Sequence, residues 1–322
     1  MTRYDRQTIL PEIGSAGQTR LAASHVLVVG AGGLGSSVIP ALAGAGIGRL
    51  RLLDDDLVSE SNLHRQTIFR MSDIGQPKAD CAAREARRLN PEIELQAIRG
   101  WLDPDTAGPL LENVDLVVDA ADSFAVSYIL SDECARRRLP LIAGSVLGRQ
   151  GYAGGFCGGG PSLRALFPEL PRNAQSCATA GVMGPVVATV GALQAQMAMS
   201  ALLGLEPSPI GQMVTVDLAG WRFSSFRFTD APEPDGPALP FISRNGLRPS
   251  DCVIELRPES ESPSPVAPHA LRLGPEAIAE WEPPSGQRVV LCCRSGLRAW
   301  RAARQLADRG HADLALLADG QA

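Results

Sequence analysis

Short apolar runs alternate with helix-compatible patterns over the first half of the chain. Each run is five or six residues long and ends in polar or glycine-rich residues. Runs of this kind are typical of strands that are buried on both faces. The predicted strands are residues 25–29, 49–53, 93–98, 114–119 and 139–143. The pattern predicts an α/β fold, a doubly wound and mostly parallel sheet with helices on both faces.

The flanking segments have other patterns. Residues 1–24 predict one N-terminal helix, and residues 151–160 are rich in glycine. The longest apolar stretch, residues 182–205, is interrupted by Gly184, Pro185 and polar residues, so we expect a buried helix from about Pro185 rather than a membrane span. Strands are predicted at 213–217 and 222–228.

A proline-rich segment divides the chain. Residues 229–240 contain four prolines and three acidic residues, a composition typical of a linker between domains. We therefore predict a nucleotide-binding domain over residues 1–228, a linker over 229–243 and a small α/β domain over 244–322. The elements expected in the small domain are strands at 253–256 and 288–292 and helices at 275–281 and 297–309.

A glycine-rich loop follows the first predicted strand. Gly30, Gly32 and Gly35 have the spacing G-x-G-x-x-G, which permits a tight turn and a close approach of backbone N–H groups to a phosphate. The second strand ends in Asp54, 19 residues after Gly35, where a Rossmann-like unit places the carboxylate that binds ribose hydroxyls. The alternative is a plain tight turn without a ligand.

Composition narrows the function. The net charge of −5 argues against nucleic acid and anionic membranes as partners, and the charged N-terminus without an apolar core predicts a cytoplasmic protein. Seven cysteines occur without a C-x-x-C pair, which argues against a disulfide framework and leaves buried or reactive thiols. Lys78 is the only lysine among 30 basic residues, either by chance or because a compact charge is needed there.

A polar cluster follows the second strand and includes Asn62, Arg65, Gln66 and Lys78. Hydride transfer to a dinucleotide does not need these groups, whereas a triphosphate needs fixed cations beside its β- and γ-phosphates. The alternative is a solvated helix face. Asp122 follows the fourth strand and is expected at the same edge of the sheet.

Seven motifs together resemble the MoeB/ThiF/E1-like adenylyltransferases over residues 3 to about 228. They are residues 3–7 (R-Y-D-R-Q), 30–35 (G-A-G-G-L-G), 52–56 (L-L-D-D-D), 61–66 (S-N-L-H-R-Q), 75–78 (G-Q-P-K), 119–122 (D-A-A-D) and 176–185 (S-C-A-T-A-G-V-M-G-P). The resemblance implies that ATP reacts with the C-terminal glycine of a ubiquitin-like sulfur carrier ending in Gly-Gly. The product is an acyl-adenylate, on the way to a thiocarboxylate for molybdopterin, thiamine or another sulfur-containing metabolite.

The resemblance also implies roles for individual residues. Asp54 would hold the ribose, Asp122 would hold Mg²⁺, and Arg6 would reach the γ-phosphate across a homodimer interface. Cys177 would assist sulfur transfer by a covalent link with the carrier. The residues implied in nucleotide binding or catalysis are Arg6, Gly30, Gly32, Gly33, Gly35, Asp54, Asn62, Arg65, Gln66, Lys78, Asp122 and Cys177.

Two positions depart from that family's pattern. Zinc-binding members of that family carry two C-x-x-C pairs. The segment that holds the first pair reads P-S-L-R-A-L-F-P at residues 161–168 here and contains no cysteine, so we expect no structural zinc. The asparagine that often follows the metal-binding aspartate is Ser123. Cys81 and Cys134 fall on apolar faces of helical patterns, and we expect them to be core residues.

The second domain contains V-L-C-C-R-S-G-L-R at residues 290–298, which resembles the active-site loop of rhodanese-like sulfurtransferases. Cys293 leaves a strand before a loop that opens a helix, where backbone N–H groups and Arg298 can stabilise a thiolate. The resemblance implies that Cys293 carries a persulfide received from a donor such as a cysteine desulfurase. An NAD-dependent oxidoreductase or a non-catalytic scaffold remain the alternative functions.

Overall fold

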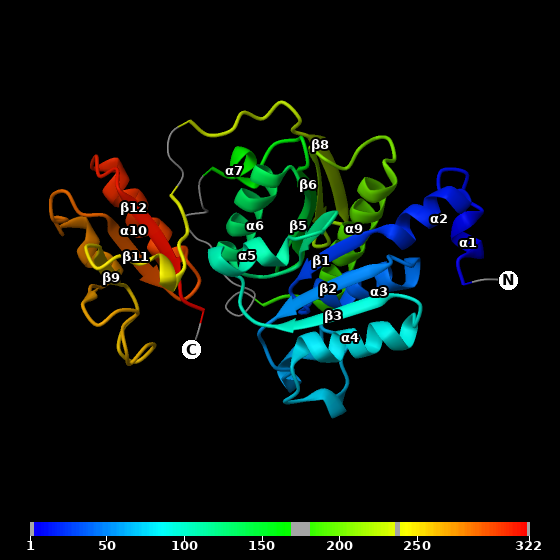
Figure 1. The fold of residues 1–322 in the computed structure, drawn as a ribbon, viewed down its shortest axis with the longest axis horizontal. Helices are drawn as coiled ribbons and strands as arrows, with labels where there is room; N and C mark the ends of the chain where they lie inside the picture. Colours follow the sequence, from blue (N-terminus) through cyan, green and yellow to red (C-terminus); the bar gives the residue numbers. More distant parts are fainter. Residues whose placement is uncertain (1–2, 169–180, 236–238, 321–322) are drawn as a thin grey trace. The chain divides into compact units, whose positions relative to one another are not determined.

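The computed structural model describes residues 3–168, 181–235 and 239–320 (Figure 1). The chain divides into two compact units. The first comprises residues 1–101, 110–122 and 130–233, and the second comprises residues 102–109, 123–129 and 234–322. The longest segment of the second unit thus begins inside the predicted linker. The boundaries at residues 228 and 244 stay predictions.

The N-terminal region differs from the prediction of one helix over residues 1–24. It contains two helices, α1 (Asp5–Thr8) and α2 (Gly14–Ala23). Pro11 lies between them and cannot donate a backbone hydrogen bond, and Gly14 has a φ of +55°. These two residues break the helix.

The described part of the first unit contains an eight-stranded sheet in the order β3-β2-β1-β4-β5-β6-β7-β8. The strands are β1 (His25–Val29), β2 (Arg49–Asp54), β3 (Glu94–Arg99), β4 (Leu116–Asp119), β5 (Pro140–Leu147), β6 (Gln150–Cys157), β7 (Gln212–Asp217) and β8 (Arg222–Arg227). β1 to β5 pair in parallel, and β6 to β8 extend the sheet by antiparallel pairing. The predicted α/β class and its five parallel strands are confirmed. The glycine-rich stretch after residue 150 is a strand, which was not predicted.

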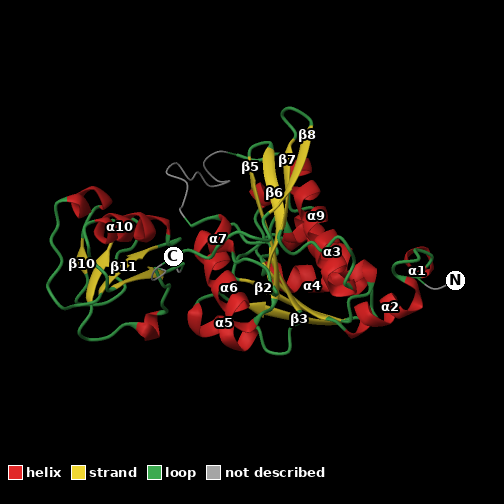
Figure 2. Cartoon of the chain, turned by 90° about the horizontal axis from the view of Figure 1, so that it is seen from above, coloured by secondary structure: helices red, strands yellow, loops and turns green. Residues whose placement is uncertain are grey.

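Helices cover both faces of the sheet (Figure 2). One face carries α3 (Gly35–Ala45), α4 (Lys78–Leu89) and α9 (Gly184–Leu203), and the other carries α6 (Phe124–Arg137) and α7 (Leu163–Leu166). A further helix, α5 (Pro104–Leu110), follows β3. In the described residues α9 is the one helix long and apolar enough to cross a membrane. It packs on α3, β5 and β6, as predicted for a buried helix.

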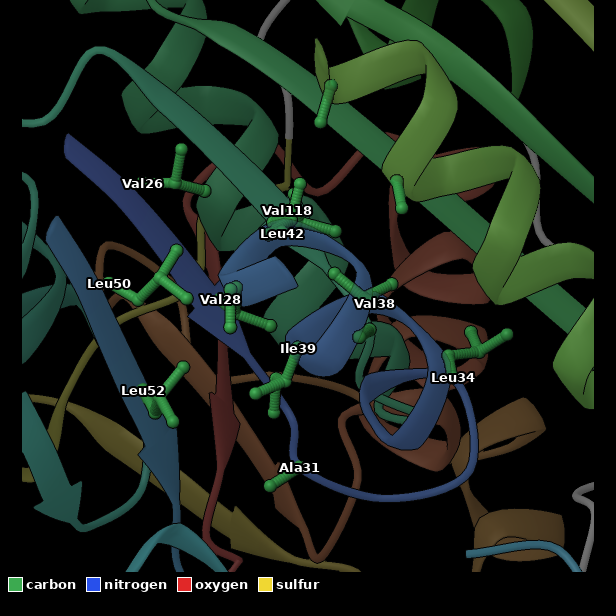
Figure 3. Close-up of a cluster of buried hydrophobic side chains, with 14 of the residues drawn as sticks. Val26, Val28, Ala31, Leu34, Val38, Ile39, Leu42, Leu50, Leu52 and Val118 are labelled. Carbon is green, nitrogen blue, oxygen red and sulfur yellow. The ribbon is translucent and has the colours of Figure 1, made fainter. Parts of the chain in front are cut away.

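The core lies between β1, β2 and α3 (Figure 3). All five residues of β1 are buried, because parallel strands in the middle of a covered sheet have no solvent-facing side. Fully burying one such aliphatic side chain contributes roughly 1.5–3 kcal/mol. The side chains in this layer include Val26, Val28, Val38, Ile39, Leu42, Leu50 and Leu52. Cys81 and Cys134 are buried, as predicted.

The second unit contains a four-stranded sheet in the order β10-β9-β11-β12, with all strands parallel. The strands are β9 (Cys252–Glu255), β10 (Leu271–Arg272), β11 (Val289–Cys293) and β12 (Leu314–Ala318), and the helix α10 is Leu297–Asp308. The helix predicted at 275–281 is instead a single 3₁₀ segment, η4 (Pro275–Ala279). β12 was not predicted.

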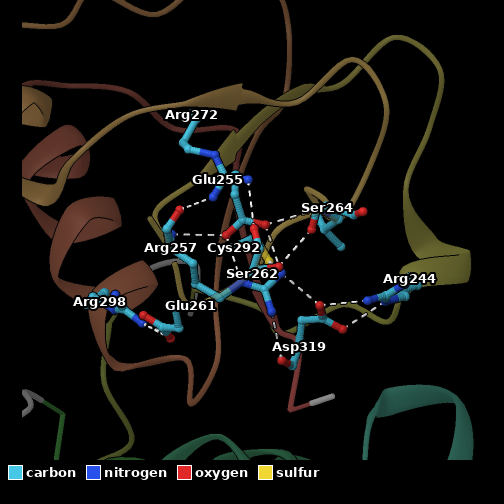
Figure 4. A network of polar contacts seen from close by, with 11 residues as sticks. Arg244, Glu255, Arg257, Glu261, Ser262, Ser264, Arg272, Cys292, Arg298 and Asp319 are labelled. Carbon is cyan, nitrogen blue, oxygen red and sulfur yellow. Dashed lines mark hydrogen bonds and ion pairs between the residues drawn. The ribbon is translucent and has the colours of Figure 1, made fainter. Parts of the chain in front are cut away.

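A buried ion network joins the carboxyl ends of β9 and β12 (Figure 4). The Arg257 guanidinium donates to Glu255 at 2.8 Å and lies 2.8 Å from Asp319 Oδ2. Arg244 adds two hydrogen bonds to Asp319, at 2.8 and 2.7 Å. Burial acts to raise the pKa of Glu255, but the hydrogen bonds from Arg257 outweigh it and lower that pKa. The network therefore keeps the buried carboxylates ionised.

His25 gives a pH-dependent prediction for stability. Its Nδ1 lies 2.6 Å from the Asn113 carbonyl oxygen, whereas its buried Nε2 has no hydrogen-bond partner in the described chain. Burial lowers the pKa of His25 below the ordinary value of 6.5. The unfolded chain therefore takes up a proton that the native state disfavours, and the free energy of unfolding should fall as pH drops through 6.5.

Urea unfolding of the wild type and of His25→Gln at about pH 7.5, 6.5 and 5.5 measures this effect. The variant should lose less stability than the wild type over this range, because it lacks the titrating group. Equal losses in both proteins would show that His25 does not contribute to the pH dependence.

Candidate nucleotide site and reactive thiol

The glycine loop connects β1 to α3 at the carboxyl edge of the sheet. Gly30 has a φ of +96°, and a Cβ atom on it would lie 2.7 Å from the backbone of Ala120, which leaves β4. A Cβ atom on Gly35 would collide with the carbonyl oxygen of Gly30, and one on Gly33 would lie 2.7 Å from Val187. A Cβ atom on Gly32 would have Gln66 Nε2 as its nearest neighbour, at 3.6 Å. Packing against backbone atoms thus requires glycine at positions 30 and 35, a side chain at Gly33 would displace Val187, and Gly32 leaves the backbone open.

Asp54 ends β2 beside this loop. Its carboxylate accepts the N–H of Ala31 at 2.7 Å and the N–H of Asp56 at 2.9 Å. Burial raises the pKa of Asp54 to about 6, although Lys78 and the two N–H groups act to lower it. Ribose hydroxyls bound by this carboxylate would be donors to its ionised form.

Lys78 is the first residue of α4. It is 4% exposed, which excludes the solvated helix face as the explanation of this residue. Its Nζ lies 2.7 Å from Asp56 Oδ2, and its backbone N–H donates to the Asp56 carbonyl at 2.9 Å. Asp56 is not among the site residues predicted from the sequence. Its position two residues after Asp54 was the available signal, since alternate residues at the end of a strand share a side.

The other three residues of the polar cluster, Asn62, Arg65 and Gln66, lie on the short 3₁₀ segment η1 (Glu60–Asn62) and the turn after it. Gln66 is buried, and its Oε1 has no hydrogen-bond partner within the described ranges. Arg65 is half-buried, with its Nη1 2.8 Å from His64 Nε2 and 3.2 Å from the Ser61 carbonyl oxygen. The buried amide is thus available to a ligand.

Asp122 follows β4 and is exposed. It lies close enough to contribute to the raised pKa of Asp55, for which burial is the main cause. The neighbouring Ser123 Oγ is buried and unpaired within the part of the chain that the structure describes. In the described ranges no three His, Cys, Asp or Glu side chains form a group that could hold a metal ion by themselves. One carboxylate still suits Mg²⁺, which commonly binds one or two carboxylates together with substrate phosphates.

Three segments meet at this edge because β1 lies between β2 and β4. The strand order reverses at β1, and ligands of open α/β sheets bind at such a switch point. The structure therefore brings together the glycine loop, Asp54, Lys78 and Asp122, as the sequence predicted. Arg6 lies exposed on α1, and its role in a homodimer stays a prediction. Cys177 lies outside the described residues.

Cys293 is the last residue of β11 and is fully buried. Its Sγ accepts the backbone N–H of Ala299 in α10 at 3.3 Å. Burial raises the pKa of Cys293, while that N–H and the nearby Arg298 charge act to lower it. Arg298 also donates to Glu261 at 2.5 Å. Cys292 lies in the hydrophobic core of this unit, so the two adjacent thiols have different environments.

The fold and this edge define an α/β nucleotide-binding protein. The model of the ThiF family matches residues 4–238, and the chain belongs to the ThiF family. The SAMP-activating enzyme E1 of Haloferax volcanii is 38% identical over 235 residues, covering 72% of this chain and 87% of that protein. The sulfur carrier protein adenylyltransferase of Thermus thermophilus is 39% identical over 225 residues, covering 67% and 83%.

A second group of relatives is longer. The adenylyltransferase and sulfurtransferase MOCS3 of Bos taurus is 41% identical over 228 residues, which cover 70% of this chain and 50% of that protein. The matched part thus spans half the length of that relative. Among solved structures, E. coli MccB with ATP has a TM-score of 0.62 at 22% identity and covers 71% of this chain and 72% of its own. This likeness supports the fold.

The pKa of Asp54 predicts how nucleoside binding depends on pH. A group with a pKa of about 6 is mostly protonated at acidic pH and then loses its capacity to accept two ribose hydrogen bonds. The affinity for adenosine should be about tenfold lower at about pH 5 than at about pH 7.5. Adenosine is the ligand of choice because it has no phosphate that titrates.

Titration calorimetry of the wild type and of Asp54→Asn at both pH values measures the effect. The variant should bind weakly, with no comparable loss on acidification. Equal affinity of the wild type at the two pH values would contradict the role given to Asp54.

Proposed function

We propose that the first unit activates the C-terminal glycine of a ubiquitin-like sulfur-carrier protein as an acyl-adenylate, with ATP as the second substrate. The observation that carries this proposal is the meeting of the glycine loop, the Asp54 carboxylate and the buried Lys78 ammonium at one switch point. Membership of the ThiF family supports it.

The reaction joins two anions. A carboxylate oxygen of the carrier's terminal glycine attacks the α-phosphorus, the bond between this phosphorus and the oxygen bridging to the β-phosphate breaks, and pyrophosphate leaves with the electron pair. Asp54 would bind the ribose, and backbone N–H groups of the loop would approach the phosphates. Lys78 and Arg65 would balance the charge that develops on pyrophosphate, with Asn62 and Gln66 as neutral donors.

Mg²⁺ is the metal that suits this site. Asp122 would hold it together with phosphate oxygens, since the donor is a hard carboxylate oxygen exposed at the strand end. When bound, the ion would neutralise phosphate charge and orient the leaving group.

The relatives' names support the choice of reaction and partner. They describe an E1 enzyme that activates SAMP, sulfur carrier adenylation, and combined adenylyltransferase and sulfurtransferase activity. We also propose, from the sequence expectations alone, a homodimer with Arg6 at the nucleotide of the partner subunit, a persulfide donor such as a cysteine desulfurase, and a cytoplasmic location. An NAD-dependent oxidoreductase is disfavoured, because the polar groups here suit a triphosphate.

Pyrophosphate exchange tests adenylation and separates it from a non-catalytic scaffold. The wild type should exchange labelled pyrophosphate into ATP when Mg²⁺ and a carrier ending in Gly-Gly are present. Asp122→Ala should lose at least about 100-fold in rate, since phosphate charge is then poorly neutralised. Glu112→Ala is the control, because Glu112 is an exposed carboxylate at the opposite end of β4. Exchange by Asp122→Ala at the control rate would contradict the role of Asp122, and a wild type that does not exchange pyrophosphate would contradict adenylation itself.

The second unit is proposed to supply sulfur through Cys293, since its Sγ meets the N–H of Ala299 at the start of a helix. The Cys293 thiolate would attack the terminal sulfur of a persulfide R–S–SH, forming Cys293–S–SH and releasing R–S⁻. The outer sulfur would then displace AMP from the acyl-adenylate. The resulting acyl disulfide joins the carrier to Cys293. Cys177 is proposed to attack the Cys293 sulfur as a thiolate, so that the S–S bond breaks, the carrier leaves as a thiocarboxylate, and Cys177 and Cys293 remain joined by a disulfide.

Mass spectrometry of the carrier tests this second step, because replacing oxygen by sulfur adds about 16 Da and leaves adenylation separately measurable. Cys293→Ala should keep pyrophosphate exchange and lose thiocarboxylate formation from a persulfide donor. Cys252→Ala is the control, a half-buried thiol at the start of β9. Wild-type thiocarboxylate formation in Cys293→Ala would remove the second unit as the sulfur source.

A further inference from the structure

The ammonium of Lys78 is buried, and its position depends on a carboxylate outside the predicted site. The Lys78 side chain is 5% exposed, whereas that of Asp56 is 67% exposed. Their charged atoms lie 2.7 Å apart. A buried cation loses much of its hydration, and a close ion pair offsets this cost only if its geometry is held.

The main chain of Asp56 also forms hydrogen bonds with Asp54 and Lys78. Its N–H donates to Asp54 Oδ1 at 2.9 Å, and its carbonyl accepts the N–H of Lys78 at 2.9 Å. Asp56 thus contacts the proposed ribose carboxylate with one main-chain group, and α4 with the other.

The position of Asp56 is fixed because the segment after β2 pairs with the segment before α4. Leu57 forms an antiparallel bridge with Pro77, and the N–H of Val58 donates to the Gln76 carbonyl at 2.9 Å. The chain after β2 therefore runs beside the residues that precede α4. This register places Asp56 opposite Lys78.

We propose that Asp56 is a positioning residue: its carboxylate holds the Nζ of Lys78 at the phosphate site, and its main chain fixes Asp54 and the start of α4. The inference rests on the proposed adenylation function. A lysine side chain has four rotatable bonds, so an unheld ammonium would sample several positions. An ion pair formed before ATP arrives removes that ordering cost from catalysis.

Chemical labelling tests the contact without any assay of activity. Lys78 is the only lysine, so its amine and the N-terminal amine are the two amines open to acetylation, and peptide mass spectrometry separates them from each other and from any acetylated cysteine or tyrosine. Asp56→Asn should raise the acetylation rate of Lys78 at least about fivefold, because the amine is released from its ion pair. Asp80→Asn is the matched control: Asp80 lies in the same helical turn and pairs with Arg99. It should change the rate less than about twofold.

A double-mutant cycle tests whether Asp56 acts through Lys78. Asp56→Asn should lower kcat/KM for ATP in pyrophosphate exchange about tenfold, yet have less than about a twofold effect in a Lys78→Ala background. Asp56→Glu retains the charge and should restore part of the activity. Thermal unfolding of each variant confirms that it is folded.

An unchanged acetylation rate in Asp56→Asn, or equal effects in both backgrounds, would overturn the positioning role. Lack of pyrophosphate exchange by the wild type with any carrier would contradict the proposed function instead. Labelling and equilibrium ATP binding in the same variants would then still decide the role of Asp56.

Discussion

A close backbone contact between the glycine loop and the chain leaving β4 fixes the geometry at the candidate nucleotide site. At Gly30 a side chain would meet the backbone of Ala120, and at Gly35 it would meet the carbonyl oxygen of Gly30. Backbone atoms cannot rotate away as a flexible side chain can, so even a methyl group would force the strands or α3 to move. Glycine at both positions therefore permits α3 to begin directly after this loop, and the N-terminus of a helix favours an anion.

The charges at this edge depend on one another. Lys78 lowers the pKa of Asp54, which burial raises to about 6. Removal of the ammonium would therefore favour the protonated, poorly accepting form of the Asp54 carboxylate. In its proposed role Lys78 would thus act on both the phosphates and the ribose of a nucleotide, and measured effects of changes at Asp54 and Lys78 should not be additive. Charges that are paired before the substrate binds need little rearrangement during the reaction.

The sequence predicted the parallel strands, because buried strands have nearly continuous apolar runs, and it predicted the edge where the polar residues meet. It did not predict β6, whose glycines disfavour a strand. The structure gives the reason for those glycines. A Cβ on Gly151 would lie 2.7 Å from the carbonyl oxygen of Ser145 in β5 and 2.9 Å from Val190 of α9, and Gly155 packs on the backbone of Pro209. Such close approaches involve residues distant in the chain and leave no local pattern. The same holds for the pair between Asp56 and Lys78, which depends on the register of two loop segments.

In the second unit, adjacent cysteines differ because side chains alternate along a strand. Cys292 lies in the core, with its Sγ 3.8 Å from the Arg257 guanidinium, whereas Cys293 meets the start of α10. The N–H of Asp319 donates to the Cys293 carbonyl at 2.9 Å, and the Asp319 carboxylate belongs to the buried ion network. The network therefore anchors the main chain that carries the Cys293 thiol. Removing one charge from such a network costs about 3–5 kcal/mol, because its partner is left buried and unpaired. The same change would weaken the hold of Asp319 on the Cys293 main chain and would therefore alter the position of the thiol relative to the N–H of Ala299.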